Sequence, residues 1–367
     1  MSTIVETDPS CPSATNGDIA AINLESARRR AWTRFAQDAR LPGIAEAVVD
    51  NERLAAQFLG DLDALDRLVM LASQLARADN SPRAALVQAE VASTEHRFAD
   101  ARDHLARAAL MGGPCQEIER HLLTIDQASG LKLDTVLAVR RRIATASGRL
   151  EDLVPLAAVL ADLDRFAEAD AVYRQALHSY GDVSPFPLAW VCFQLGMLWG
   201  ELVPEPNLDL AAAWYERAIA YVPAYAKARV HLAEVYLSQD RTADAEVLLL
   251  PALSSTDPEV HWRLAEVLCA EGRLEEAETQ LDAARRGFDR VLAQHPLAFA
   301  DHAAEFYAGS GNDCRRALEL TRANLANRPT RRAMRQADAI ATVTGERQPA
   351  TPFTRSWRYL RRYLLSA

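Results

Sequence analysis

The sequence lacks a long apolar segment, and it has no excess of positive charge. No window reaches about 18 uninterrupted apolar residues, the length that a membrane-spanning helix requires. The net charge is −9, from 41 basic and 50 acidic residues, so there is no overall positive field to attract phosphates. We therefore predict no transmembrane segment and no general nucleic-acid binding.

Signals for export, disulfide bonds and zinc binding are missing as well. The 5 cysteines are scattered, with no CxxC pair and no cysteine–histidine cluster at zinc spacing. The first residues are polar and include Glu6 and Asp8, where a signal peptide needs a basic start and an apolar run. We expect reduced thiols and a cytoplasmic protein. Only Lys132 and Lys227 are lysine, a bias typical of a GC-rich genome, so we expect a bacterial source.

Catalytic motifs are absent too. The sequence contains no GxSxG, no Walker P-loop, no GxGxxG that opens a helix and no HExxH. His295 and His302 lie near Asp301 and Glu305, but their spacing matches no standard zinc pattern. We predict a chain that is not an enzyme, with no catalytic residues, no cofactor-binding residues and no metal ligands.

The composition of the sequence favours α-helices. It is 49% hydrophobic but only 7% aromatic, and alanine and leucine, both strong helix formers, lead the composition. Alternating β-branched runs beside Asn-Gly or Asp-Gly turns are not found. The sequence therefore predicts an all-α protein.

A short phrase recurs along the chain, a turn followed by a helix with small, large and small residues at steps of four and three. One copy runs from Gly272 to Ala277, Leu281 and Ala284. The other copies are Asp240 with Ala245, Leu249 and Ala252; Asp164 with Ala169, Tyr173 and Ala176; and His96 with Ala101, Leu105 and Ala108. Small residues at such spacing let helix backbones approach closely, so each copy predicts a helix packed on a neighbour.

These units resemble tetratricopeptide repeats (TPRs), which are helix–turn–helix units of 34 residues. The unit from Pro258 carries Leu264, Ala265 and Leu268 on its first helix, and the unit from Ala226 carries Leu232, Ala233 and Tyr236. A third unit, near Ala189, has extra residues around 205–207 and is similar to a Sel1-type repeat. The resemblance implies an α-solenoid, a right-handed superhelix of antiparallel helix hairpins.

The expected organisation has four parts. Residues 1–18 are predicted as a disordered tail, and 19–80 as an N-terminal helical region with helices near 18–40, 44–58 and 61–77. Residues 81–345 are predicted as the TPR-like array, with a weak repeat signature at 114–147. Residues 346–367 form a basic, aromatic C-terminal helix.

By resemblance, the first helix of each unit lines a concave groove. The inward positions that we nominate for a peptide groove are Trp190, Phe193, Met197, Lys227, Val230, Glu234, Trp262 and Glu266. Apolar anchors flanked by charges suit a partner peptide or helix. In the alternative interpretation, Trp190, Phe193 and Trp262 fill a tightly wound solenoid and touch no ligand. The side chains present do not match the carboxylate clamp of chaperone-binding TPR domains.

The C-terminal helix allows two interpretations. Trp357, Arg358, Arg361 and Arg362 could dock to a partner or to an anionic membrane, which would be a peripheral contact. The other possibility is a helix that caps the last hairpin.

The leading hypothesis is a non-enzymatic scaffold or adaptor that binds another protein or peptide in its groove. A second hypothesis is a regulatory or assembly factor that acts through its terminal helices. A third is an accessory subunit of a partner enzyme.

Overall fold

The computed structural model describes residues 12–345, and within them it contains helices and no strands. The helices are α1 Gly17–Gln37, α2 Ile44–Leu59, α3 Asp63–Ala78, α4 Pro82–Thr94, α5 Phe98–Leu110, α6 Cys115–Ala128, α7 Leu133–Ser147, α8 Leu150–Asp162, α9 Phe166–Ser179, α10 Pro185–Met197, α11 Leu208–Tyr221, α12 Ala226–Ser238, α13 Thr242–Leu249, α14 Pro258–Ala270, α15 Leu274–Gln294, α16 Ala300–Ala308, α17 Cys314–Asn327 and α18 Arg331–Gly345. A π-helical turn, η1 Leu198–Leu202, continues α10, and a 3₁₀ turn, η2 Leu250–Ser254, continues α13. The chain is an all-α, TPR-like array of helical hairpins, as predicted.

The turns inside the hairpins share one backbone conformation. His96, Asp164, Asp240 and Gly272 each precede the second helix of a pair and have φ of 56°, 60°, 59° and 78°. A residue with a left-handed backbone conformation allows a short turn between two helices, and glycine adopts this conformation without steric cost. The repeated phrase therefore marks a real structural repeat, in which His96 stands where another unit has glycine.

The small residues of the phrase are buried where the paired helices cross. Ala101, Ala169, Ala245 and Ala277 have 0% exposure. Gly196 in α10 belongs to the same class, because a Cβ on it would lie 2.5 Å from the Tyr215 ring of α11. Close backbone approach is thus what these positions provide.

Compact packing divides the chain into two units, each made of segments that are not consecutive. Unit 1 comprises residues 1–21 and 133–252, and unit 2 comprises 22–132 and 253–367. The expected boundaries at residues 18, 80 and 345 separate consecutive parts of the chain, whereas each of these units combines segments that are distant in the sequence.

Unit 1 contains the helices from α7 to α13, with residues 12–16 packed on them. The amide of Thr15 donates to the carbonyl of Val183 at 2.8 Å, and the Tyr221 hydroxyl donates to the carbonyl of Pro12 at 2.9 Å. These residues were predicted to be part of a disordered tail, but their backbone has specific partners. The rest of that tail, residues 1–11, lies outside the described residues.

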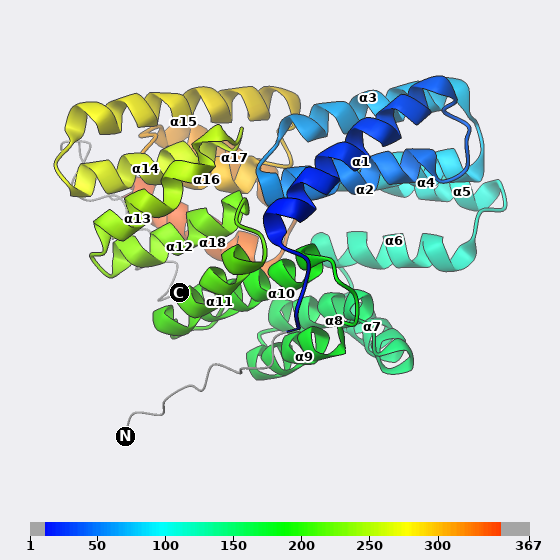
Figure 1. Ribbon diagram of the computed structural model, residues 1–367, viewed down its shortest axis with the longest axis horizontal. Helices are drawn as coiled ribbons and strands as arrows, with labels where there is room; N and C mark the ends of the chain where they lie inside the picture. Colours follow the sequence, from blue (N-terminus) through cyan, green and yellow to red (C-terminus); the bar gives the residue numbers. More distant parts are fainter. Residues whose placement is uncertain (1–11, 346–367) are drawn as a thin grey trace. The chain divides into compact units, whose positions relative to one another are not determined.

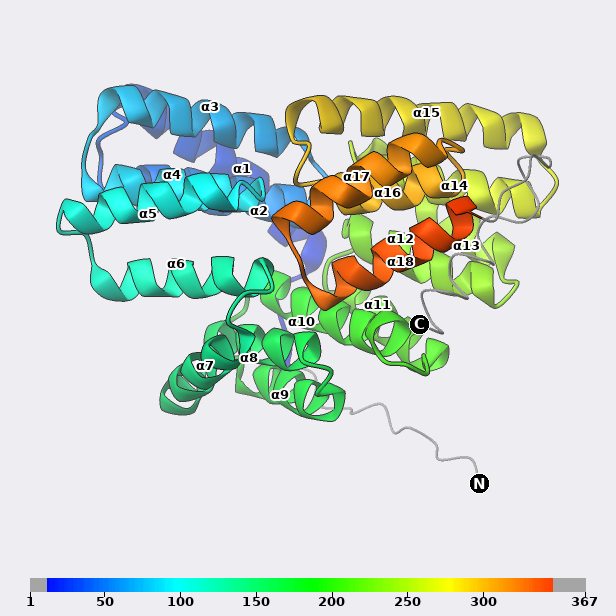
Figure 2. The same cartoon turned by 180° about the vertical axis from the view of Figure 1, so that it is seen from behind.

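Unit 2 joins the helices from α2 to α6 with those from α14 to α18 (Figures 1 and 2). The Thr256 hydroxyl accepts from the amide of Leu62 at 2.7 Å, and Arg290 pairs with Asp63. Next to this junction Trp262, Phe288 and Phe306 form one aromatic core. Segments about 200 residues apart therefore share one core.

The expected helices near 18–40, 44–58 and 61–77 agree with α1, α2 and α3 to within a few residues. In the stretch with the weak repeat signature, α6 and α7 form as expected. Among the described residues, none of the helices combines the length and hydropathy needed to cross a bilayer.

Candidate interaction surface and the histidine–glutamate cluster

The predicted groove positions on α10 differ in exposure. Phe193 is 3% exposed and packs against the rings of Tyr215, Tyr225 and His231 at 5.7, 5.3 and 5.1 Å between centroids. Trp190 stacks on Phe193 at 5.9 Å and is only half-buried. Met197 is half-buried as well. Phe193 therefore acts as core, and Trp190 and Met197 reach the surface.

The predicted groove positions on α12 show the same division. Val230 is 1% exposed and Glu234 is 7% exposed, whereas Lys227 is half-buried. Among the groove positions of unit 1, the half-buried side chains are therefore Trp190, Met197 and Lys227.

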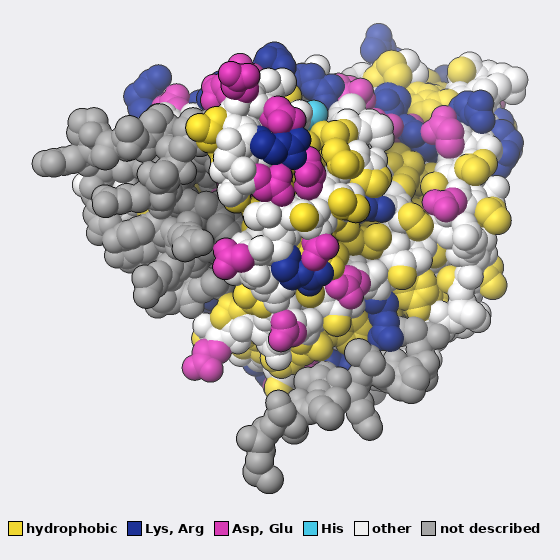
Figure 3. All heavy atoms as spheres, turned by 60° about the vertical axis from the view of Figure 1, so that its left-hand side comes forward, with side chains coloured by type: hydrophobic (Ala, Val, Ile, Leu, Met, Phe, Trp, Pro, Cys, Tyr) yellow, Lys and Arg dark blue, Asp and Glu magenta, His cyan; other side chains and the backbone are white. Residues whose placement is uncertain are grey.

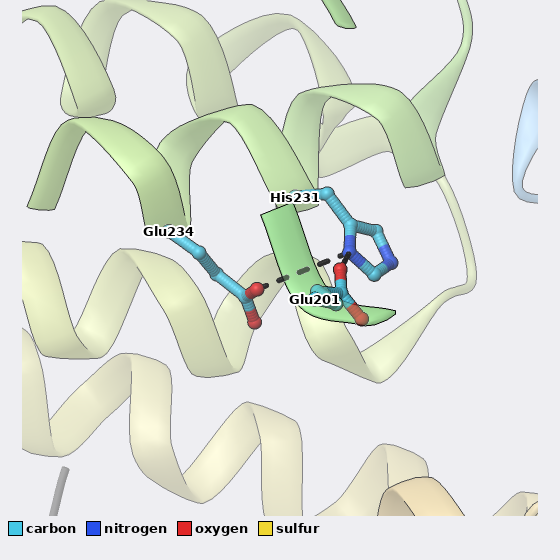
Figure 4. A group of neighbouring side chains, drawn as sticks. All are labelled: Glu201, His231 and Glu234. Atoms are coloured by element: carbon cyan, nitrogen blue, oxygen red, sulfur yellow. Dashed lines mark hydrogen bonds and ion pairs between the residues drawn. The ribbon is translucent and has the colours of Figure 1, made fainter. Parts of the chain in front are cut away.

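A cluster of one histidine and two glutamates includes one of the predicted groove positions, Glu234. The Nδ1 atom of His231 is 2.6 Å from Oε1 of Glu201 and 3.9 Å from Oε2 of Glu234 (Figure 4). His231 and Glu234 are one helical turn apart on α12, and Glu201 comes from η1. The three donor atoms lie within 4.8 Å of one another. We call these three residues the His231 cluster.

In unit 2 the predicted positions Trp262 and Glu266 bind each other. The indole Nε1 of Trp262 donates to Glu266 at 2.7 Å, and the Ser310 hydroxyl donates to the same carboxylate oxygen at 2.8 Å. Arg263 forms an ion pair with Glu266 at 3.0 Å and lies over the Trp262 ring. Trp262 is only 3% exposed. Its indole therefore helps to hold α14 to the turn after α16.

A second polar network surrounds His302 on α16. Its Nδ1 is 2.8 Å from Glu259 of α14. Burial opposes protonation of the imidazole, but the charges of Glu259 and Asp301 outweigh it and raise the pKa of His302 to about 10. Burial likewise opposes ionisation of Asp301, yet His302 and Arg328 hold its pKa well below the usual range. These charged side chains therefore connect α14, α16 and the loop before α18.

Of the sequence group His295, His302, Asp301 and Glu305, the last three lie together, with His302 Nε2 at 3.9 Å from Asp301 and the charge of Glu305 acting on His302, whereas His295 lies apart from them. His295 instead contacts Glu95 and Asp66, each at 2.8 Å. The Glu305 carboxylate accepts from Gln336 of α18 at 2.7 Å.

Four of the predicted groove residues, Phe193, Val230, Glu234 and Trp262, are buried in the described chain. They offer little surface to a ligand; the alternative interpretation placed Trp190, Phe193 and Trp262 in the core, and of these Trp190 is half-buried. The groove itself stays a prediction, and its half-buried positions in unit 1 are Trp190, Met197 and Lys227. The predicted docking residues Trp357, Arg358, Arg361 and Arg362 lie outside the described residues.

The surface itself shows charges of both signs. On the face in Figure 3, acidic and basic side chains lie next to one another and hydrophobic side chains gather between them. This mixture agrees with the absence of an overall positive field.

Sequence reasoning overlooked Glu201 and His231. The spacing His231-x-x-Glu234 could have signalled them, because residues three apart share a helix face. Glu201 is 30 residues away from His231 and has no such signal.

Comparison with known proteins gave structures only: no family model and no curated protein matches the chain. The chain is similar to YrrB, a TPR protein with an unusual peptide-binding site, at 19% identity and a TM-score of 0.30, over 54% of this chain and 97% of that one. It is also similar to the C-terminal part of a TPR repeat-containing protein from Cytophaga hutchinsonii, at 13% identity and a TM-score of 0.33, over 80% and 97%. Yeast Tom70 matches at 13% identity and a TM-score of 0.31, over 94% of each chain. At such scores the likeness carries no argument about function.

Proposed function

We propose that this protein is a non-enzymatic interaction scaffold that holds a peptide or helix of a partner protein against α10 and α12. Arrays of helical hairpins present extended surfaces built from successive units. The observation that carries the proposal is the contrast between half-buried Trp190, Met197 and Lys227 and the buried Phe193 and Val230 at neighbouring groove positions.

The chemistry of these side chains suits a protein partner. Tryptophan and methionine are enriched in the cores of interfaces, where they bury much area for little loss of conformational entropy or adapt to irregular shapes. Trp190 is held against Phe193 by ring stacking, so its orientation is partly fixed before a partner binds. Lys227 adds a cation that favours a carboxylate near the apolar anchors of the bound segment.

The scarcity of lysine allows a direct test. Lys132 and Lys227 are the only lysines in the sequence. An amine-reactive crosslinker applied to the Lys132→Arg variant in cells or lysate can react with the chain only at Lys227 and the amino terminus. We expect a partner whose crosslink maps to Lys227 and disappears in the Lys132→Arg/Lys227→Arg double variant.

Substitution of Trp190 gives the second measurement. Trp190→Ala should reduce the yield of the Lys227 crosslink while circular dichroism and the melting temperature stay close to wild type, because the side chain is half-buried. Phe193→Ala is the contrasting variant, expected to cost about 3–5 kcal/mol of stability because its ring is core. A partner that crosslinks equally well to a folded Trp190→Ala protein would refute the proposed surface.

A further inference from the structure

The His231 cluster brings three metal-ligand groups together inside unit 1, independently of the proposed interaction surface. Side-chain exposure is 11% for His231, 20% for Glu201 and 10% for Glu234. One imidazole nitrogen and two carboxylate oxygens converge from two elements, η1 and α12 (Figure 4). This is a donor set of a kind that proteins use for divalent transition metals.

The distances between the donor atoms are close to those found around a small cation. Two ligand atoms that are each about 2.1 Å from a tetrahedral zinc ion lie about 3.4 Å apart. His231 Nδ1 is 2.6 Å from one carboxylate oxygen and 3.9 Å from the other. Around a metal the His231–Glu201 pair would open by about 0.8 Å and the His231–Glu234 pair would close by about 0.5 Å. The two carboxylates, which lie within 4.8 Å of each other, would close by at most about 1.4 Å.

Neighbouring groups orient the donors. Phe193 meets the His231 ring edge-on at 5.1 Å, and Tyr215 lies against the same ring at 5.7 Å. The Tyr215 hydroxyl donates to Oε1 of Glu201 at 3.2 Å. Hydrogen bonds to ligating carboxylates and an apolar wall are the usual support of a metal site.

The backbone also contributes to the geometry. Glu201 stands in the π-helical turn Leu198–Leu202, and such turns are rare and frequent at functional sites. A π-helical turn places its side chains differently from an α-helix, and here Glu201 faces α12. This turn thus carries the carboxylate that meets His231 of α12.

We propose that Glu201, His231 and Glu234 bind a divalent cation of the zinc class, through Oε1, Nδ1 and Oε2 respectively. Three protein ligands leave a fourth tetrahedral position for water or for a donor from another molecule. The imidazole and the small number of donors favour Zn²⁺ or Co²⁺ over Ca²⁺ and Mg²⁺, which prefer six or more oxygen ligands. Occupancy links η1 to α12 and so stabilises the pair.

The test uses the full chain after removal of metals with a chelator. Addition of Co²⁺ should give the visible absorption of tetrahedral cobalt at one equivalent, and calorimetry should give one Zn²⁺ site. Glu201→Gln and His231→Gln should each weaken Zn²⁺ binding tenfold or more and abolish the cobalt bands. His178→Gln, a substitution in α9 outside the cluster, should bind as wild type does.

The Tyr215→Phe variant keeps all three ligands and removes the hydroxyl that donates to Glu201, so about tenfold weaker binding is expected. Circular dichroism of each variant verifies the fold. Zn²⁺ should also raise the melting temperature of the wild type and leave that of His231→Gln unchanged. The proposal is overturned if the wild type binds no Zn²⁺, or if folded Glu201→Gln and His231→Gln bind it unchanged. In either case the cluster is a hydrogen-bonded imidazole–carboxylate group without a metal.

Discussion

Replacing His295 by alanine should loosen unit 2 at the junction of its two chain segments. His295 follows α15 and its side chain is 3% exposed. Nδ1 lies 2.8 Å from Glu95, after α4, and Nε2 lies 2.8 Å from Asp66 of α3. One imidazole therefore ties residues 200 and 229 positions away in the sequence.

The expected loss of stability follows from the burial of each carboxylate that His295 contacts. Asp66 is 40% exposed, so its ion pair contributes less than about 1 kcal/mol. Glu95 is 5% exposed, and removing one partner of a buried pair typically costs 3–5 kcal/mol. Glu95 keeps an ion pair with Arg97 at 2.7 Å, which places the expected loss near the lower end, about 3 kcal/mol.

Hydrogen exchange read by mass spectrometry is the suitable assay, because it measures opening of each segment separately. A loss of about 3 kcal/mol should speed the exchange of peptides from the end of α15 roughly 100-fold, with unit 1 peptides unchanged. Arg290→Gln is the matched control: Arg290 and Asp63 pair at the same junction but are 41% and 43% exposed, so exchange should change less than about fivefold. An effect of His295→Ala no larger than that of the control would refute the reasoning.

The pH dependence of this difference has a definite sign. Burial opposes protonation of His295, but hydrogen bonds with Glu95 and Asp66 outweigh it and raise the pKa of His295 above its ordinary 6.5. Its contribution is therefore full below about pH 6.5 and is lost as pH rises through the folded value. Burial opposes ionisation of Glu95, yet His295 and Arg97 lower its pKa below 4.5, so its contribution is lost as pH falls through that folded value. The gap between wild type and His295→Ala should be largest between about pH 4.5 and 6.5.

Two further predictions concern the repeat itself. Gly196→Ala gains up to about 1 kcal/mol of helix propensity, but its Cβ would lie 2.5 Å from the buried Tyr215 ring. We therefore expect a net loss of roughly 1–2 kcal/mol in the free energy of unfolding measured with urea. In the control Gly181→Ala the Cβ meets nothing within 4 Å, so the free energy of unfolding should stay within about 0.5 kcal/mol of wild type. Asp240 has φ of 59°, so Asp240→Gly should be more stable than Asp240→Ala by about 1 kcal/mol, and equal midpoints would argue against a left-handed requirement at this turn.

The repeated phrase allowed the helical hairpins to be predicted because their determinants are local. A turn at Asp164 or Gly272 and an alanine five residues later are visible directly in the local sequence. The same information located α14 and α15 and assigned their buried faces, since Ala277, Leu281 and Ala284 point to one side of a helix.

The contacts that join the two chain segments of unit 2 have no such local signal in the sequence. His295 was grouped with His302 because they are close in sequence, whereas its partners are Glu95 and Asp66. A histidine after a helix is equally compatible with solvent, a metal or a distant carboxylate. Only the path of the whole chain selects among them, and helical periodicity does not encode that path.

The same reasoning explains why only some of the nominated groove positions are accessible. The repeat pattern predicts Trp262 on the inner side of α14, but the exposure of its side chain depends on the residues that the following hairpin packs over it. Phe306 of α16 lies 5.5 Å from the Trp262 ring, and Ser310 lies within 3.1 Å of its indole nitrogen. Position in a repeat therefore fixes the direction of a side chain, whereas its availability to a partner is set by the size of the residues in the next unit. Candidate ligand contacts in such arrays are best sought where that next unit leaves the side chain half-buried, as at Trp190 and Lys227.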